Sequence, residues 1–394
     1  MGWNTWNTFA QDINEELIRT TADTMVSSGL LAAGYNYLVI DDCWALKERD
    51  KSTGRLVADP EKFPSGMKAV ADYVHSKGLK FGMYSCCGTL TCAGYPSSFD
   101  YEFIDAETFA SWGVDFLKYD HCYKPDTAPS DLLYRKMGLA LANCGRDILF
   151  SACSWGVNQT HEWIKSTGAH MWRSTYDIFD SWQKIKEIYD QNSPLQPYNG
   201  QGCFNDMDML VVGMHGKGHV GLSGCTEEEY RTHFSVWAMF NSPLMIGCDI
   251  RKMDEDTKNI LMNKDVIAVN QDPAGRQPFR AGTYGCDTWV KFLEGGDIAV
   301  LIVNPYDSDC RGTLHLTDIG LDVASGRAIK ARDLWTGDDL GVIQDELLFP
   351  SVKAHSCKFL KCSIVKRLKR PAPRRAENGA DKTAAQRAGH FSVQ

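Results

Sequence analysis

The sequence lacks two features that would assign it to a membrane or repeat protein. Its apolar runs, such as residues 298–303, are far shorter than the roughly 20 residues that a membrane-spanning helix needs. The 34 glycines follow no strict period, which excludes collagen-like and solenoid architectures. Hydrophobic residues make up 43% of the chain and charged residues 23%, values that exclude wholesale disorder. We therefore expect a globular protein with no membrane partner.

Metal and dinucleotide motifs are also scarce. None of the 14 cysteines has the paired spacing of a structural zinc site. Most lie in apolar segments and are interpreted as buried thiols, with one or two disulfides left open. A Gly-x-Gly-x-x-Gly pattern at residues 216–221 opens no helix, so a nucleotide-binding function is not favoured. We expect no metal and no cofactor.

Charge is unevenly distributed along the chain. The net charge is −8, but residues 366–394 carry eight basic and two acidic residues, which leaves −14 for residues 1–365. An acidic body argues against nucleic acid as a partner. The segment 366–394 is predicted to be a basic, disordered tail. Met1 is followed by no apolar signal core, which predicts a cytoplasmic protein, or a secreted one if native residues upstream are missing.

Strand-like and helix-like segments alternate over the first two thirds of the sequence. Strands are predicted at 2–6, 35–40, 79–84, 114–119, 148–152, 170–173, 204–210 and 244–247, and helices at 14–33, 65–76, 105–112, 132–143, 162–166, 181–191 and 227–240. Eight such units fit the size and rhythm of a (β/α)₈ TIM barrel. The continuous apolar character of the strands is typical of a parallel sheet covered on both sides.

The pattern changes after residue 274. Short strands at 288–292, 298–303, 312–316, 328–334 and 355–359 are separated by turn residues, without a strong helix between them. This indicates an antiparallel β-sandwich. The predicted organisation is a catalytic barrel at 1–274, a C-terminal β-sandwich at 275–365 and the tail.

Polar side chains gather where the barrel strands end. They are Trp6, Asp41, Asp42, Tyr84, Lys118, Asp120, Arg173, Asp177 and Asp208. In a TIM barrel these ends form one cavity mouth. Carboxylates, cations and aromatic rings together suit sugar hydroxyls and the apolar face of a sugar ring, and glycoside cleavage needs two carboxyl groups. A lone Asp after a strand is more often a helix cap, and Asp180-Ser181, before the helix at Trp182, is interpreted in that way.

The same residues carry a resemblance to glycoside hydrolase family 27. The matching segments are Met1-Gly2-Trp3-Asn4-Thr5-Trp6, Ile40-Asp41-Asp42-Cys43-Trp44, Asp59-Pro60-x-x-Phe63-Pro64, Lys118-Tyr119-Asp120, Trp172-Arg173 with Asp177, Asn205-Asp206-Met207-Asp208-Met209 and Asn270-Gln271-Asp272-Pro273. They occur in order over residues 1 to about 275. The family contains α-galactosidases and α-N-acetylgalactosaminidases.

The resemblance implies a retaining exo-glycosidase that removes terminal α-galactosyl residues. Asp120 matches the nucleophile and Asp177 the general acid/base. Sugar-binding positions are matched by Trp6, Asp41, Asp42, Tyr84, Lys118, Cys153, Ser154, Arg173 and Asp208. Cys92 and Cys122 match a pair that is often disulfide-bonded beside the nucleophile. The implied partner is a galactoside or related oligosaccharide, and a homo-oligomer is left open.

One position departs from many α-galactosidases of the family. Many of those enzymes carry at this position a Glu that binds the sugar 2-hydroxyl, whereas this chain has Ser154. The N-acetylgalactosaminidases of the family also carry Ser there. Val157 is bulkier than the Ala that those enzymes carry and would crowd an acetyl group. We favour α-galactosidase activity, with α-N-acetylgalactosaminidase and β-L-arabinopyranosidase as alternatives. A catalytically silent sugar-binding protein is a further alternative, which retention of both Asp120 and Asp177 argues against.

Overall fold

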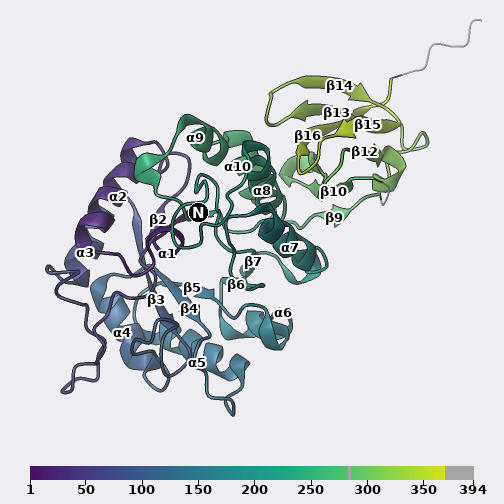
Figure 1. Cartoon of the computed structure of the whole chain (residues 1–394). Helices are drawn as coiled ribbons and strands as arrows, with labels where there is room; N and C mark the ends of the chain where they lie inside the picture. Colours follow the sequence, from purple (N-terminus) through teal and green to yellow (C-terminus); the bar gives the residue numbers. More distant parts are fainter. Residues whose placement is uncertain (283–284, 369–394) are drawn as a thin grey trace, which may run out of the picture.

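Eight parallel strands form a barrel in the computed structural model, which describes residues 1–282 and 285–368 (Figure 1). The strands are β1 (Gly2–Asn4), β2 (Tyr37–Val39), β3 (Lys80–Cys86), β4 (Phe116–Asp120), β5 (Leu149–Ala152), β6 (Met171–Arg173), β7 (Phe204–Asp206) and β8 (Met245–Ile246). Their order is β7-β6-β5-β4-β3-β2-β1-β8. A parallel bridge between Leu210 and Ile246 closes the ring after β7. The predicted barrel is confirmed.

Side chains fill the barrel interior. Val39, Phe116, Met171 and Met245 form one buried cluster there with Met209. A filled interior makes the barrel a packed core rather than a channel. Polar side chains that line the larger opening therefore lie toward the C-terminal ends of the strands.

Helices cover the outside of the barrel. They are α2 (Glu15–Ser27), α3 (Met67–Ser76), α4 (Glu102–Trp112), α5 (Ser130–Asn143), α6 (Thr160–Trp163), α7 (Trp182–Asn192), α8 (Glu227–Met239), α9 (Glu255–Leu261) and α10 (Lys264–Asn270), with the short α1 (Trp6–Phe9). Turns of 3₁₀ helix lie at η1 (Val157–Gln159), η2 (Ile164–Thr167), η3 (Gln196–Tyr198), η4 (Ile250–Lys252), η5 (Glu294–Gly296) and η6 (Leu316–Ile319). Within the described part of the chain, no helix combines the length and apolarity needed to cross a bilayer.

Local sequence explains where these helices begin and where the predictions were inexact. Thr226 and Glu229 form a capping box at the start of α8, which satisfies two backbone donors. The predicted helix 14–33 stops at Ser27, because Gly29 adopts a left-handed φ of 89° that breaks helical continuation. Ser181 caps α7, so the cap expected at Asp180-Ser181 is present and its acceptor is the Ser181 side chain.

Two antiparallel sheets follow the barrel. The larger contains β9 (Phe279–Arg280), β10 (Asp287–Phe292), β11 (Ile298–Val303), β13 (Arg327–Asp333), β14 (Asp339–Ile343) and β16 (Cys357–Lys366), and the smaller pairs β12 (Cys310–His315) with β15 (Glu346–Val352). Buried aliphatic residues from both sheets form a separate core. The predicted sandwich is confirmed, whereas β9, β14 and β15 were not predicted. Residues 369–394 of the predicted tail lie outside the described residues.

A buried lysine joins the two parts. Lys291 on β10 donates from Nζ to the carbonyl oxygens of Ala238 and Val269 and to Oδ1 of Asn241. The two carbonyls belong to α8 and α10, the last helices of the barrel. Burial lowers the pKa of Lys291 to about 7. The sandwich is thus held against the outer layer of the barrel, next to α8.

Candidate active site

The strand ends and the loops after them bring ten of the predicted residues to one small cavity. It is lined by Trp6, Asn7, Asp41, Asp42, Tyr84, Cys92, Lys118, Asp120, Trp155, Arg173, Asp177, Asp208, Met209 and Val220. The lining comes from the C-terminal ends of the strands and from the segments that follow β1 to β7, as expected for a TIM-barrel site. Cys153 lies in an adjoining cavity inside the barrel, and Ser154 lines neither.

Of the two candidate catalytic carboxyl groups, Asp120 is more enclosed than Asp177. It ends β4 and is 6% exposed. Tyr84 Oη donates to its Oδ2 at 3.1 Å, and the His121 backbone N–H donates to its Oδ1 at 2.9 Å. Burial raises the pKa of Asp120 to about 6, although Lys118 opposes the rise. Each oxygen is therefore oriented by one donor while the carboxyl group keeps a proton more readily than an ordinary Asp.

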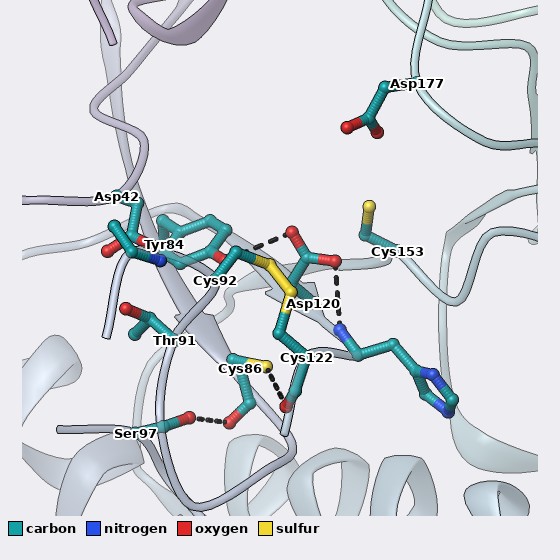
Figure 2. Close-up of a disulfide and its surroundings, with 12 residues drawn as sticks. Asp42, Tyr84, Cys86, Thr91, Cys92, Ser97, Asp120, Cys122, Cys153 and Asp177 are labelled. Atoms are coloured by element: carbon teal, nitrogen blue, oxygen red, sulfur yellow. Dashed lines mark hydrogen bonds between the residues drawn. A yellow bond between two sulfur atoms is a disulfide. The ribbon is translucent and has the colours of Figure 1, made fainter. Parts of the chain in front are cut away.

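Asp177 differs from Asp120 in exposure and in charge environment. Its side chain is 61% exposed and forms a 2.6 Å ion pair with Arg173. Partial burial raises the pKa of Asp177, but Arg173 and Lys118 outweigh that effect and the net shift is downward. Figure 2 shows the Asp177 carboxyl group directed toward Asp120. The two groups thus face one cavity from β4 and β6.

Arg173 forms ion pairs with two carboxylates, Asp177 and Asp208. It is 3% exposed and pairs with Asp208 at 2.6 Å. Burial disfavours its charge, but Asp208 and Asp177 raise the pKa of Arg173 above its ordinary value. Asp208 itself has a φ of 77°, a strained conformation for a residue other than Gly. Its Oδ2 accepts from the Ile178 backbone N–H at 2.7 Å, so the loop that carries Asp177 is fixed at its next residue.

The two adjacent carboxylates after β2 have different partners. Asp41 accepts from Lys118 Nζ and Asn4 Nδ2 through Oδ2, both at 2.8 Å. Asp42 accepts from backbone N–H groups, those of Cys43 at 2.7 Å and Ala93 at 2.9 Å. Burial raises the pKa of Asp42. Separate partners explain how two neighbouring acids coexist at a buried strand end.

A disulfide borders the nucleophile candidate. Cys92 and Cys122 are bonded, as the resemblance implied, and Figure 2 shows the bridge next to Asp120. The bridge ties the loop that follows β3 to the loop that follows β4. Among the described residues, Cys92, Asp120 and Cys122 are the one trio of potential metal ligands within 4.8 Å of one another. Both sulfurs are already bonded, so the trio offers no thiolate ligand.

Two family models match this chain. The model described as "Alpha galactosidase A" matches residues 1–272, and "Alpha galactosidase C-terminal beta sandwich domain" matches residues 283–362. The chain belongs to the α-galactosidase family, glycoside hydrolase family 27. Its members are glycoside hydrolases, which the two carboxyl groups facing one cavity fit.

Individual relatives place the chain within the family. Alpha-galactosidase 2 of Arabidopsis thaliana is 47% identical over 91% of this chain and 88% of its own length. Alpha-galactosidase I of Mortierella vinacea is 37% identical, with a TM-score of 0.85 over 92% of this chain and 96% of its own. A β-L-arabinopyranosidase of Geobacillus stearothermophilus is similar at 26% identity and a TM-score of 0.82, over 92% and 95%.

Ser154, the residue that differs from many α-galactosidases, is buried behind the cavity surface. Its Oγ lies 2.8 Å from the Thr160 hydroxyl. Val157 does not line the cavity either; Trp155 does. The predicted cavity residues did not include Trp155, although a Trp followed by Gly in a loop after a barrel strand was the available signal. Asn7, Met209 and Val220 were also missed.

Proposed function

We propose that this chain hydrolyses terminal α-galactosyl residues by double displacement, with Asp120 as nucleophile and Asp177 as general acid and base. The observation that carries the proposal is the pairing of an enclosed carboxyl group, held by two donors, with an exposed one in the same cavity. Family membership and the α-galactosidase relatives supply the substrate class.

In the first step an Asp120 carboxylate oxygen forms a bond to the anomeric carbon. The bond from that carbon to the leaving oxygen breaks, and Asp177 gives its proton to this oxygen. In the second step water attacks the anomeric carbon and gives a proton to Asp177, while the bond to Asp120 breaks. Two inversions retain the anomeric configuration. Carboxyl oxygens about 5–5.5 Å apart suit this route.

The donors on Asp120 suit the role of nucleophile. Tyr84 and the His121 N–H each take one of its oxygens, which fixes the plane of the carboxylate without occupying every lone pair. Lys118 lies on the same face of β4 and favours the ionised form. An attacking group held in a fixed orientation reacts with little reorganisation.

Proton placement must change when the sugar binds. In the free protein, burial favours a proton on Asp120, whereas Arg173 favours ionised Asp177. Catalysis needs the reverse arrangement. A sugar ring that covers the exposed Asp177 removes water from its carboxylate, which raises its pKa. The free pair carries one proton below about pH 6, so binding has only to move that proton rather than add one.

Sugar recognition falls to the fixed polar groups around the pair. Asp41 and Asp42 would accept from the 4- and 6-hydroxyls, and Lys118 would donate to the same edge of the ring. These groups are held by protein partners before the sugar arrives. Preorganised acceptors discriminate well between epimers, because a misplaced hydroxyl leaves a buried group unpaired. The axial 4-hydroxyl of galactose is the feature that they would select.

Two measurements test the proposal. The first compares p-nitrophenyl α-galactoside with the α-N-acetylgalactosaminide and the β-L-arabinopyranoside, and we expect the galactoside to have the highest kcat/KM. The second is Asp120→Asn, which should lower kcat by at least about 10⁴-fold while galactose still binds. A variant that retains near wild-type turnover, or a preference for either other sugar, would overturn the corresponding assignment.

A further inference from the structure

An aromatic pair stands at the cavity mouth outside the set of residues assigned above. The rings of Trp155 and Tyr176 are 5.9 Å apart with an interplanar angle of 31°. Trp155 lines the cavity, and Tyr176 is 61% exposed. Neither the indole N–H nor the phenol hydroxyl has a hydrogen-bond partner within the described residues. Large exposed rings of this kind at a binding site are candidates for ligand contact.

The backbone fixes the position of Trp155. The residue has a φ of 57°, in the left-handed region that non-glycine residues rarely adopt. Gly156 follows with a φ of 74°, and a Cβ there would lie 2.1 Å from the carbonyl oxygen of Ser174. Its N–H donates to the Arg173 carbonyl at 3.1 Å. The loop after β5 is therefore packed directly on the loop after β6 that carries Tyr176.

A third ring supports the pair from behind. His121 meets Trp155 edge-on at 5.6 Å, and its Nε2 lies 2.9 Å from the Ser130 hydroxyl. Burial lowers the pKa of His121 to about 4, so the ring is neutral near neutral pH. His121 directly follows Asp120 in sequence. The indole is thus held at a fixed place relative to the nucleophile.

The location of the pair separates it from the sugar that is transferred. Tyr176 directly precedes Asp177, which must lie beside the leaving oxygen to protonate it. Trp6, which matches a sugar-binding position, follows β1, whereas Trp155 follows β5, on the opposite side of an eight-stranded ring. The cavity therefore has one aromatic wall on each side, and the Trp155 wall is on the side of the proton donor.

We propose that Trp155 and Tyr176 form a platform that binds the ring of the leaving group. This inference rests on the proposed function and names the residues that contact the aglycone. A pyranose or phenyl ring would lie with its apolar face on the aromatic surface. The free indole N–H would be available to a hydroxyl of the leaving sugar. The chemical class favoured is a galactoside whose aglycone begins with a ring.

The test uses Tyr176→Ala and three substrates with different leaving groups. α-Galactosyl fluoride has no aglycone ring, p-nitrophenyl α-galactoside has an aromatic ring but needs little acid assistance, and melibiose has a sugar ring and needs that assistance. We expect kcat/KM to fall roughly three- to tenfold for the two substrates with rings and to stay within about twofold for the fluoride. Tyr176→Phe should behave like wild type. Tyr306→Ala, an exposed tyrosine on the sandwich, is the matched control.

Other outcomes would overturn the platform. A loss confined to melibiose would mean that the substitution displaced Asp177 and impaired proton donation. An equal loss on all three substrates would place Tyr176 on the transferred sugar, and no loss would remove it from the site. A wild-type protein inert toward α-galactosyl fluoride would overturn the proposed function and, with it, the platform.

Discussion

The pH dependence of the reaction offers the most direct test of the active-site electrostatics. Catalysis requires one proton shared by Asp120 and Asp177, because one group must be ionised and the other protonated. The higher pKa of the pair is that of Asp120, about 6, and Asp177 lies below its ordinary value. As pH rises through about 6, the pair loses its last proton and the acid disappears. The kcat/KM value, which reports ionisations of the free enzyme, should therefore fall as the pH rises above about 6.

The size of the fall follows from the titration. With an apparent pKa of about 6, roughly 9% of the pair retains its proton at pH 7 and about 1% at pH 8. We expect kcat/KM for p-nitrophenyl α-galactoside to be near maximal at about pH 4–5.5 and about 100-fold lower at pH 8. The assay is initial rate at substrate concentrations far below KM, measured from pH 3.5 to 8.5 at constant ionic strength.

A charge substitution tests whether Asp120 causes the fall in kcat/KM at high pH, the alkaline limb of the pH profile. Lys118 lowers the pKa of Asp120, so Lys118→Met should move the alkaline limb to higher pH, whatever its effect on the absolute rate. Lys68→Met, which removes an exposed cation paired with Asp72, should leave the limb in place. An alkaline limb above pH 8 in the wild type, or one that Lys118→Met leaves unmoved, would refute this reasoning.

Two further predictions concern structures that support the site. Arg49→Met leaves the fully buried Asp105 without its bidentate partner and should lower the unfolding free energy by about 3–5 kcal/mol at pH 7; urea titration should show a smaller loss at pH 4, where the stranded carboxyl group can protonate. Arg55→Met, at an exposed pair, should cost less than about 0.5 kcal/mol. Replacing both Cys92 and Cys122 by Ala opens a bridge with a sequence separation of 30 and should destabilise the fold by roughly 3–4 kcal/mol, seen as a lower Tm, with a higher KM for the galactoside. An unchanged Tm would contradict this account of the bridge.

Barrel strands were predictable because their burial on both faces leaves continuous apolar runs. The segment at 79–84 is an example: β3 occupies Lys80–Cys86 and its residues from Phe81 onward are buried. Strands of the sandwich that combine exposed positions with short length were harder. β14, at Asp339–Ile343, has no fully buried residue, so hydrophobicity gives it little signal. Pairing with β13 decides its conformation, and a single sequence does not show that partner.

Disulfide pairing is also hard to predict from a single sequence, because it depends on which cysteines the fold brings together. The Cys92–Cys122 bridge was expected only from the resemblance. The second bridge, between Cys286 and Cys310, was left open, because 14 cysteines allow many pairings. It joins the residue before β10 to the first residue of β12, and these two strands lie in different sheets. That proximity arises from the packing of the sheets.

Placement of residues in one cavity could be predicted where a side chain leaves the end of a strand, but not in the loop after β5. A strand fixes the direction of its last residues, which is why Asp41, Lys118 and Asp120 could be placed together. The loop at 154–157 reverses that direction: φ becomes positive at Trp155, so the chain turns Ser154 into the wall and Trp155 toward the cavity.

Alignment to a family motif transfers a position, but a role follows only if the side chain reaches the ligand. The Ser154 hydroxyl is one bond beyond Cβ and is engaged with Thr160, so a short residue at this position supports the loop rather than lining the cavity. A chain that lacks a longer acceptor there must draw its discrimination at the sugar 2-position from neighbouring groups. Of the residues around that loop, Trp155 and Arg173 line the cavity, and Arg173 is committed to two carboxylates. Ser154 therefore supports the turn that presents Trp155 to the cavity, and it does not itself supply a contact at the sugar 2-position.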